Sequence, residues 1–236
     1  AEIAKRIRVD LPIVGDALNV LRQLVPLVEP VDRTAWIEMI DSWRGETRDR
    51  SRQWEDSDKL VPQYIVRSLS DITRGEAIMV SDVGQNQMWE AQYYVHNRFR
   101  GLITSGGLGT MGFGLPASIG VQIGCPDAPV WLVAGDGGLQ MTIQELATIR
   151  QEGLPIKIAL LNNGYLGMVR QWQELFYDRN YCGTPLLGPD FVRLAEAYGI
   201  TGISVKTREE VVPALERAAS IDGPVLIDFR IEQEHN

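Results

Sequence analysis

The segment from Val130 to Trp172 most constrains the fold, because it contains two short apolar runs, Val130–Val133 and Ile156–Leu161. Each run has the length of a buried strand, and the stretch between them favours a helix. A strand, a helix and a second strand of these lengths form a right-handed parallel crossover. The carboxyl ends of both strands then lie at one edge of a parallel sheet, where open α/β sheets bind ligands.

End signals mark the helix between these strands. Thr142 followed by Glu145 predicts a capping box, which would point the helix N-terminus toward the ligand-binding edge. Gly153 suits a left-handed residue at the end of the helix, and Pro155 prevents its continuation. We therefore expect one helix between Thr142 and Gly153.

Small polar clusters follow both strands, at Gly135–Gly137 (GDG) and at Asn162–Gly164 (NNG). The Asp136 carboxylate and the Asn163 amide oxygen suit Mg²⁺ when phosphate oxygens complete its ligand shell. The glycines allow the backbone to approach a phosphate closely. Two tight turns with Asp136 and Asn163 as capping residues are the alternative. Because both clusters end adjacent strands, we favour a Mg²⁺-diphosphate site.

The spacing of the two clusters, with twenty-four residues between Gly137 and Asn162, resembles the metal-diphosphate motif of thiamine diphosphate enzymes. The strings at Thr104–Ala117 (TSGGLGTMGFGLPA) and Leu166–Tyr177 (LGMVRQWQELFY) are similar to the catalytic subunit of acetohydroxyacid synthase, also called acetolactate synthase. This resemblance covers nearly the whole chain. It implies the thiamine diphosphate-binding α/β fold, a mostly parallel sheet of about six strands with helices on both faces, plus a short helical N-terminal extension.

The resemblance also assigns residues to the site. The Mg²⁺ ligands would be Asp136, Asn163 and the backbone carbonyl of Tyr165. The side chain of Met111 would lie beneath the thiazolium ring and force the bent cofactor shape, although a lone Met usually packs in a core. The cofactor-binding set would comprise Val83, Gln85, Asn86, Gly109, Met111, Gly135, Asp136, Gly137, Gly138, Asn163, Tyr165, Gly167 and Met168.

A helix at Leu166–Tyr177 would carry the substrate pocket, formed by Met168, Val169 and Trp172. Such an apolar face is normally core, but in the family these positions lie above the thiazolium ring. Met111 and Trp172 are then the candidate catalytic residues, and Trp172 would sense the size of the acceptor 2-ketoacid. Two positions depart from the family. Asn86 stands where many members have His, and Gly164 replaces a larger polar residue.

The activity implied is decarboxylation of pyruvate and transfer of its two-carbon unit to a second 2-ketoacid, a step of branched-chain amino-acid biosynthesis. A Glu from another domain would activate the cofactor, and FAD is expected only in the complete enzyme. We therefore expect this chain to be a fragment that is inactive alone. A homo-oligomer (dimer or tetramer) and a regulatory subunit are expected partners. The alternatives are a related carboligase, a 2-ketoacid decarboxylase, a natural split subunit, or a cofactor-free module.

Three regions are expected along the chain. Residues 1–30 resemble a remnant of the family's middle domain, with an extended run at Leu11–Val14 followed by a helix. Residues 31–70 read as a helical linker, and residues 71–236 as the cofactor domain. Further strands are expected at Ala77–Val80, Gly202–Val205 and Pro224–Ile231, and further helices from Gln85 to about Asn97, where His96 would lie, and at Pro189–Tyr198.

Composition excludes some functions. The formal net charge of −8 and the pI of about 4.9 argue against a nucleic-acid partner. There is no secretory start, and no apolar run approaches membrane-spanning length, so we expect no membrane partner. Cys125 and Cys182 lie far apart without metal-ligand spacing, which favours reduced thiols and a cytoplasmic location.

Overall fold

The structure is a computed structural model that describes residues 3–51, 54–55 and 57–232, without the side chains of residues 48–51. The chain divides into two compact units, with the boundary between residues 52 and 53. This boundary falls inside the predicted linker at residues 31–70. The origin of residues 1–30 in a middle domain stays a prediction.

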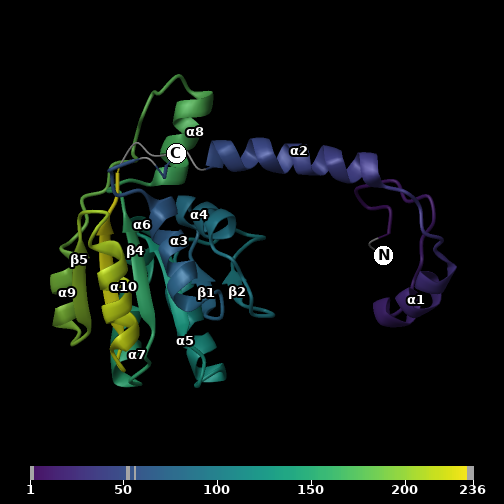
Figure 1. Cartoon of the computed structure of the whole chain (residues 1–236). Coiled ribbons are helices and arrows are strands. Elements are labelled where there is room, and N and C mark those ends of the chain that lie inside the picture. Colours follow the sequence, from purple (N-terminus) through teal and green to yellow (C-terminus); the bar gives the residue numbers. More distant parts are fainter. Residues whose placement is uncertain (1–2, 52–53, 56, 233–236) are drawn as a thin grey trace. The chain divides into compact units, whose positions relative to one another are not determined.

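The first unit consists of helices and irregular chain (Figure 1). It contains α1 (Ala17–Leu24), the 3-10 turn η1 (Val25–Leu27) and α2 (Thr34–Ser51). Asp16 caps α1, because its side chain accepts a hydrogen bond from the Asn19 backbone N–H at 3.0 Å. The extended run predicted at Leu11–Val14 forms no strand with any described residue. Without a neighbouring strand, such a run has no partner for its backbone groups.

The second unit contains a six-stranded sheet among its described residues, and every pair of neighbouring strands is parallel. The spatial order is β2-β1-β3-β4-β6-β5. This confirms the predicted α/β fold. The strands are β1 (Ile78–Ser81), β2 (Leu102–Thr104), β3 (Val130–Gly135), β4 (Lys157–Asn162), β5 (Thr201–Val205) and β6 (Val225–Arg230).

Helices cover both faces of the sheet, as predicted (Figure 1). Alternate strand residues supply the two cores, so that Trp131 and Val133 face one side and Leu132 and Ala134 the other. One core is completed by α3 (Pro62–Thr73), α4 (Gln85–Tyr93) and α10 (Val211–Ser220). The other is completed by α5 (Gly114–Gly124), α6 (Asp136–Met141), α7 (Leu146–Gln151) and α9 (Phe191–Ala197).

The crossover between β3 and β4 starts earlier than predicted. The helix α6 begins at Asp136, directly after β3, and the 3-10 turn η2 (Ile143–Glu145) separates it from α7. The capping-box prediction was therefore wrong. The Thr142 hydroxyl instead donates to the backbone carbonyl of Gly112 at 3.0 Å. The predicted C-terminal end of this helix is confirmed. Gly153 has a φ of +63°, and the Leu154 N–H donates to the carbonyl of Ile149 across the final turn of α7.

Two other local predictions were wrong. The short edge strand β2 was missed, because its three residues adjoin residues 106–114, where five glycines weaken any local strand signal. The helix α4 ends at Tyr93 rather than near Asn97, so His96 lies in a loop. Tyr94 leaves the helix with extended backbone, buries its ring and places its hydroxyl 2.6 Å from that of Thr73. No helix among the described residues has the length and apolar character needed to cross a membrane.

Candidate cofactor site

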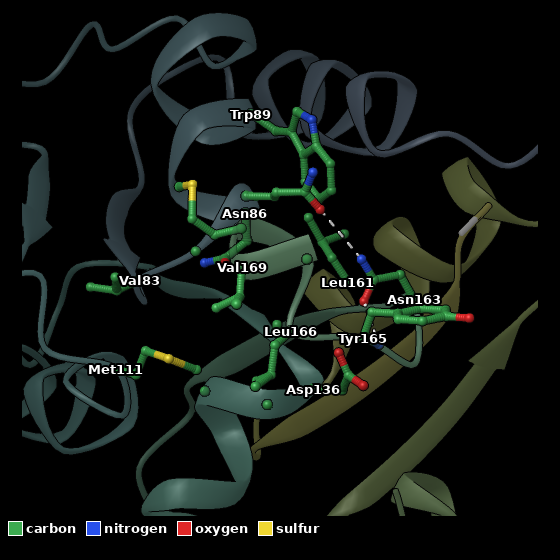
Figure 2. Close-up of a pocket in the computed structure, with 17 residues that line it drawn as sticks. Val83, Asn86, Trp89, Met111, Asp136, Leu161, Asn163, Tyr165, Leu166 and Val169 are labelled. Atoms are coloured by element: carbon green, nitrogen blue, oxygen red, sulfur yellow. Dashed lines mark hydrogen bonds between the residues drawn. The ribbon is translucent and has the colours of Figure 1, made fainter. Parts of the chain in front are cut away.

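A pocket lies where β1, β3 and β4 reach their carboxyl ends, as predicted for the ligand-binding edge (Figure 2). Its lining combines apolar side chains with a small number of polar groups, which is the usual make-up of a small-molecule site. In Figure 2, Asp136, Asn163 and Tyr165 lie at the right of the view, and Val83 and Met111 lie at the left. The lining residues are Val83, Gly84, Gln85, Asn86, Trp89, Met111, Gly135, Asp136, Gly137, Gly138, Leu161, Asn163, Tyr165, Leu166, Gly167, Met168 and Val169.

Asp136 brings a buried carboxylate with a free oxygen to this pocket. The residue is 2% exposed, and its Oδ2 atom has no hydrogen-bond partner among the described residues. Burial raises the pKa of Asp136 to about 6, although the N–H groups of Asp136 itself, Gly137 and Gly164 oppose this rise. A buried carboxylate oxygen without a donor is costly unless a cation or proton meets it. The position therefore suits a metal ligand.

Asn163 lies in the turn that follows β4. Its Oδ1 atom accepts a hydrogen bond from the Tyr165 N–H at 3.0 Å, and its Nδ2 atom lies 3.5 Å from the Gln85 side-chain oxygen (Figure 2). An amide oxygen has two lone pairs, so Oδ1 keeps one acceptor site for a further ligand. The turn after β4 is thereby tied to the turn after β1. The predicted oxygen ligands come from strand ends that adjoin in the sheet, and this arrangement fits a hard divalent cation.

Glycines allow the turns to pack closely around the pocket. A Cβ atom on Gly167 would overlap the Gln85 Oε1 atom and lie 2.9 Å from the Asn163 Nδ2 atom. A Cβ atom on Gly137 would lie 2.9 Å from Leu166. No side chain fits at either position without displacing a neighbour. These glycines therefore let the turns that follow β1, β3 and β4 approach one another at the pocket.

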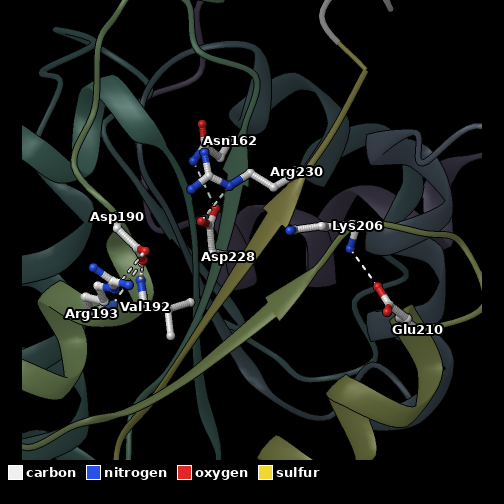
Figure 3. Close-up of polar contacts among 8 residues, drawn as sticks. All are labelled: Asn162, Asp190, Val192, Arg193, Lys206, Glu210, Asp228 and Arg230. Atoms are coloured by element: carbon white, nitrogen blue, oxygen red, sulfur yellow. Dashed lines mark hydrogen bonds and ion pairs between the residues drawn. The ribbon is translucent and has the colours of Figure 1, made fainter.

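A polar network supports the end of β4 (Figure 3). The Asn162 amide donates to Asp228 Oδ1 at 2.9 Å, and the Arg230 Nε atom pairs with Asp228 Oδ2 at 2.8 Å. Asp228 is almost fully buried on β6. It therefore fixes the residue immediately before Asn163. The sequence reasoning missed Asp228, although a single Asp within the apolar run VLIDF at Val225–Phe229 was an available signal.

All but one of the residues that were predicted to bind the cofactor are found in the lining of this pocket. Gly109 does not line it, but a Cβ atom there would lie 3.9 Å from the lining residue Val83. Asn86 lines the pocket, and its Nδ2 atom donates to the backbone carbonyls of Asp82 and Val133 at 2.7 and 3.3 Å. Asn86 therefore ties the end of β1 to β3.

The predicted substrate residues lie on α8 (Gly167–Phe176), which confirms the helix expected there. Met168 and Val169 line the pocket, whereas Trp172 is 58% exposed and packs against Phe176, with 5.4 Å between ring centroids. The role of Trp172 stays a prediction. The lining residues Gly84, Trp89, Leu161 and Leu166 were not among the predicted site residues. Trp89 follows Asn86 at helical spacing, which could have revealed it.

Residues 82–229 match the family model described as the thiamine pyrophosphate enzyme, C-terminal TPP binding domain. The match covers more than half of the chain and contains nearly all of the pocket elements described above. The chain belongs to the thiamine pyrophosphate enzyme family. Thiamine pyrophosphate and thiamine diphosphate are two names for the same cofactor, so this family is the one that the motif spacing indicated.

Relatives within the thiamine pyrophosphate enzymes point to one group. The chain is 45% identical to the acetolactate synthase of Mycobacterium leprae, over 97% of this chain and 38% of that protein. It is 44% identical to the acetolactate synthase isozyme 3 large subunit of Escherichia coli, over 92% of this chain and 39% of that protein. The chain is 39% identical to the mitochondrial acetolactate synthase catalytic subunit of Saccharomyces cerevisiae, over 98% of this chain and 34% of that protein. The chain thus spans about two fifths of the length of these relatives.

Proposed function

We propose that this chain forms the diphosphate- and metal-binding half of the cofactor site in an acetolactate synthase. The observation that carries the proposal is the buried Asp136 carboxylate, whose Oδ2 atom lacks a partner among the described residues and which lines the same pocket as Asn163. Similarity to acetolactate synthases over 97% of the chain supports the choice of reaction.

Asp136, Asn163 and the backbone carbonyl of Tyr165 would hold Mg²⁺, which the diphosphate oxygens would also ligate. Gln85 and Asn86, with the backbone at Gly135–Gly138, would surround the diphosphate. When bound, thiamine diphosphate supplies the nucleophilic carbon and the electron sink for decarboxylation and carbon–carbon bond formation. The protein's part is to place the cofactor, neutralise its charge and exclude water.

Met111 would shape the reacting end of the pocket. Its terminal methyl group lies 3.6 Å from the position that a Cβ atom on Gly137 would take, so it reaches from the loop between β2 and α5 toward the start of α6. Val83 lines the same pocket. A flexible thioether at this place can fill the space between the two rings of the cofactor and hold them at an angle.

The α8 face would receive the 2-ketoacid substrates. Met168 and Val169 already line the pocket, and Trp172 follows one turn later on the same helix. We propose that Trp172 limits the size of the acceptor, pyruvate or 2-ketobutyrate, once the rest of the enzyme encloses this face. Aromatic side chains suit such a wall because they are large and rigid.

The complete enzyme would supply the remaining parts. The Glu that activates the cofactor, the FAD site and the oligomer contacts of a dimer or tetramer would involve segments or subunits beyond this chain. A regulatory subunit is a further proposed partner. This chain alone would therefore form no acetolactate, because it would lack the Glu that activates the cofactor.

A chimera tests this function. The chain would replace the matching part of the Mycobacterium leprae acetolactate synthase, with which it shares 45% identity. Given pyruvate, thiamine diphosphate, Mg²⁺ and FAD, we expect the chimera to form acetolactate and its Asp136→Ala variant to form none. Acetaldehyde as the main product would indicate a 2-ketoacid decarboxylase instead. A folded chimera that binds the cofactor but yields no product would contradict the proposal.

A further inference from the structure

Asp82 is a buried carboxylate that has no place in the function proposed above. It follows β1 directly and is fully buried. Its Oδ1 atom accepts hydrogen bonds from the N–H groups of Val83 at 2.6 Å and Gly112 at 3.0 Å. Its Oδ2 atom accepts from the Gly114 N–H at 3.3 Å. One side chain thus joins a strand end to a loop about thirty residues away.

No Lys, Arg or His forms an ion pair with Asp82 among the described residues. Burial raises the pKa of Asp82, and the N–H groups of Val83, Gly112 and Gly114 oppose that rise. The backbone of the loop is therefore the polar environment that makes burial of this group tolerable. Hydrogen bonds to a charged acceptor are stronger than those between neutral groups.

The loop that Asp82 binds is the loop that carries Met111. Met111 precedes Gly112, whose φ of +84° is a conformation that glycine adopts without strain. The Thr142 hydroxyl donates to the Gly112 carbonyl at 3.0 Å, so both backbone polar groups of Gly112 are bound by side chains. The backbone that follows Met111 is therefore fixed, and the Met111 side chain is directed into the pocket.

Asp82 also contacts the start of α6. A Cβ atom on Gly138 would lie 3.0 Å from both Cγ and Oδ1 of Asp82. A Cβ atom on Gly114 would lie 2.9 Å from the Cβ atom of Asp82. The carboxylate therefore sits among the end of β1, the Met111 loop and the helix that begins with Asp136.

We propose that Asp82 is a positioning residue, which fixes the Met111 loop against α6 before the cofactor binds. Met111 then stands at a set distance from the backbone of Gly137, in the space that the bent cofactor would occupy. The part of this inference that concerns the cofactor rests on the proposed function. The part that concerns the loop does not.

The first test is amide hydrogen exchange, measured by NMR on this chain without ligand. In the wild type, we expect the amides of Gly112 and Gly114 to exchange much more slowly than that of the exposed loop residue Gly106. Fast exchange at Gly112 in the wild type would overturn the proposal, and this arm needs no variant to fold.

The second test is Asp82→Asn, with Glu90→Gln as a matched acid-to-amide change at another buried position. The amide places its own N–H groups against the backbone donors, so we expect exchange at Gly112 and Gly114 to accelerate about tenfold or more, while β3 and β4 keep their protection. Glu90→Gln should leave both glycines unchanged. Acceleration across the whole sheet, or none at the two glycines, would contradict a positioning role.

A third measurement addresses the cofactor. In calorimetric titrations with thiamine diphosphate and Mg²⁺, we expect Asp82→Asn to raise the Kd about tenfold or more, and Thr142→Val to raise it less. An unchanged Kd in Asp82→Asn would overturn the proposal. If the wild-type chain binds no cofactor, the proposed function fails at this point, and the exchange experiment still decides whether Asp82 positions the loop.

Discussion

The replacement Glu90→Gln should make the chain more stable at alkaline pH and leave it nearly unchanged at acid pH. Glu90 is 1% exposed on α4, and burial raises its pKa to about 7. Its Oε1 atom lies 2.8 Å from the Nε2 atom of His96, a side chain whose own pKa is lowered by burial. Neither group is therefore favoured in its charged form.

The size of the effect follows from linkage. An exposed glutamate has a pKa of 4.5, whereas the pKa of Glu90 in the folded chain is about 7, so the two differ by about 2.5 pH units. Each pH unit corresponds to about 1.4 kcal/mol, so ionisation of Glu90 lowers the free energy of unfolding by up to about 3 kcal/mol. Because the folded pKa is raised, this loss is absent well below pH 4.5, develops between about pH 4.5 and 7, and is complete above pH 7. Glutamine has no such loss.

Urea denaturation followed by tryptophan fluorescence measures this difference. We expect wild type and variant to have similar free energies of unfolding at about pH 4, and the variant to be more stable by up to about 3 kcal/mol at about pH 8. Because His96 contacts Glu90, the same comparison in a His96→Gln background separates the contribution of His96 from that of Glu90. An equal difference at both pH values would refute the reasoning, because Glu90 would then ionise as an exposed carboxyl does.

Three further substitutions test the packing of the site. Gly167→Ala should displace the Gln85 side chain, which the new Cβ atom would overlap, and weaken thiamine diphosphate binding about tenfold in calorimetric titration. Gly120→Ala is its control, because no atom outside the local helix backbone lies within 4 Å of the new Cβ. Thermal unfolding of this control should show about 0.5–1 kcal/mol of added stability, since Ala favours a helix more than Gly does. Asp228→Asn should weaken the support of Asn162 and raise the apparent Mg²⁺ requirement about tenfold, measured as Mg²⁺-dependent cofactor binding; an unchanged requirement would separate Asp228 from the metal site.

The sheet and its binding edge could be predicted because the signals are local. Val130–Val133 and Ile156–Leu161 are apolar runs bounded by small polar residues, and such runs have few alternatives to buried parallel strands. Both runs became strands with slightly shifted ends, and Asp136 and Asn163 line one pocket at their carboxyl ends.

The supporting contacts could not be predicted because they join residues far apart in the sequence. Asp82 binds a loop thirty residues away, and Asp228 binds Asn162 across sixty-six residues. Thr142 and Glu145 carry a local capping signal, yet the Thr142 hydroxyl bonds to Gly112, again thirty residues distant. A local pattern gives no information on such a competing partner, and the tertiary contact prevails.

The most direct test of the account is a calorimetric titration of the purified chain with thiamine diphosphate, with and without Mg²⁺, beside an Asp136→Ala control. The account predicts binding that requires Mg²⁺ and that weakens at least about a hundredfold in the control, because the Asp136 Oδ2 atom, which has no partner in the part of the chain that the structure describes, is the proposed metal ligand. Binding that is equally strong without Mg²⁺, or that survives unchanged in Asp136→Ala, would contradict the assignment of this pocket to a metal-diphosphate.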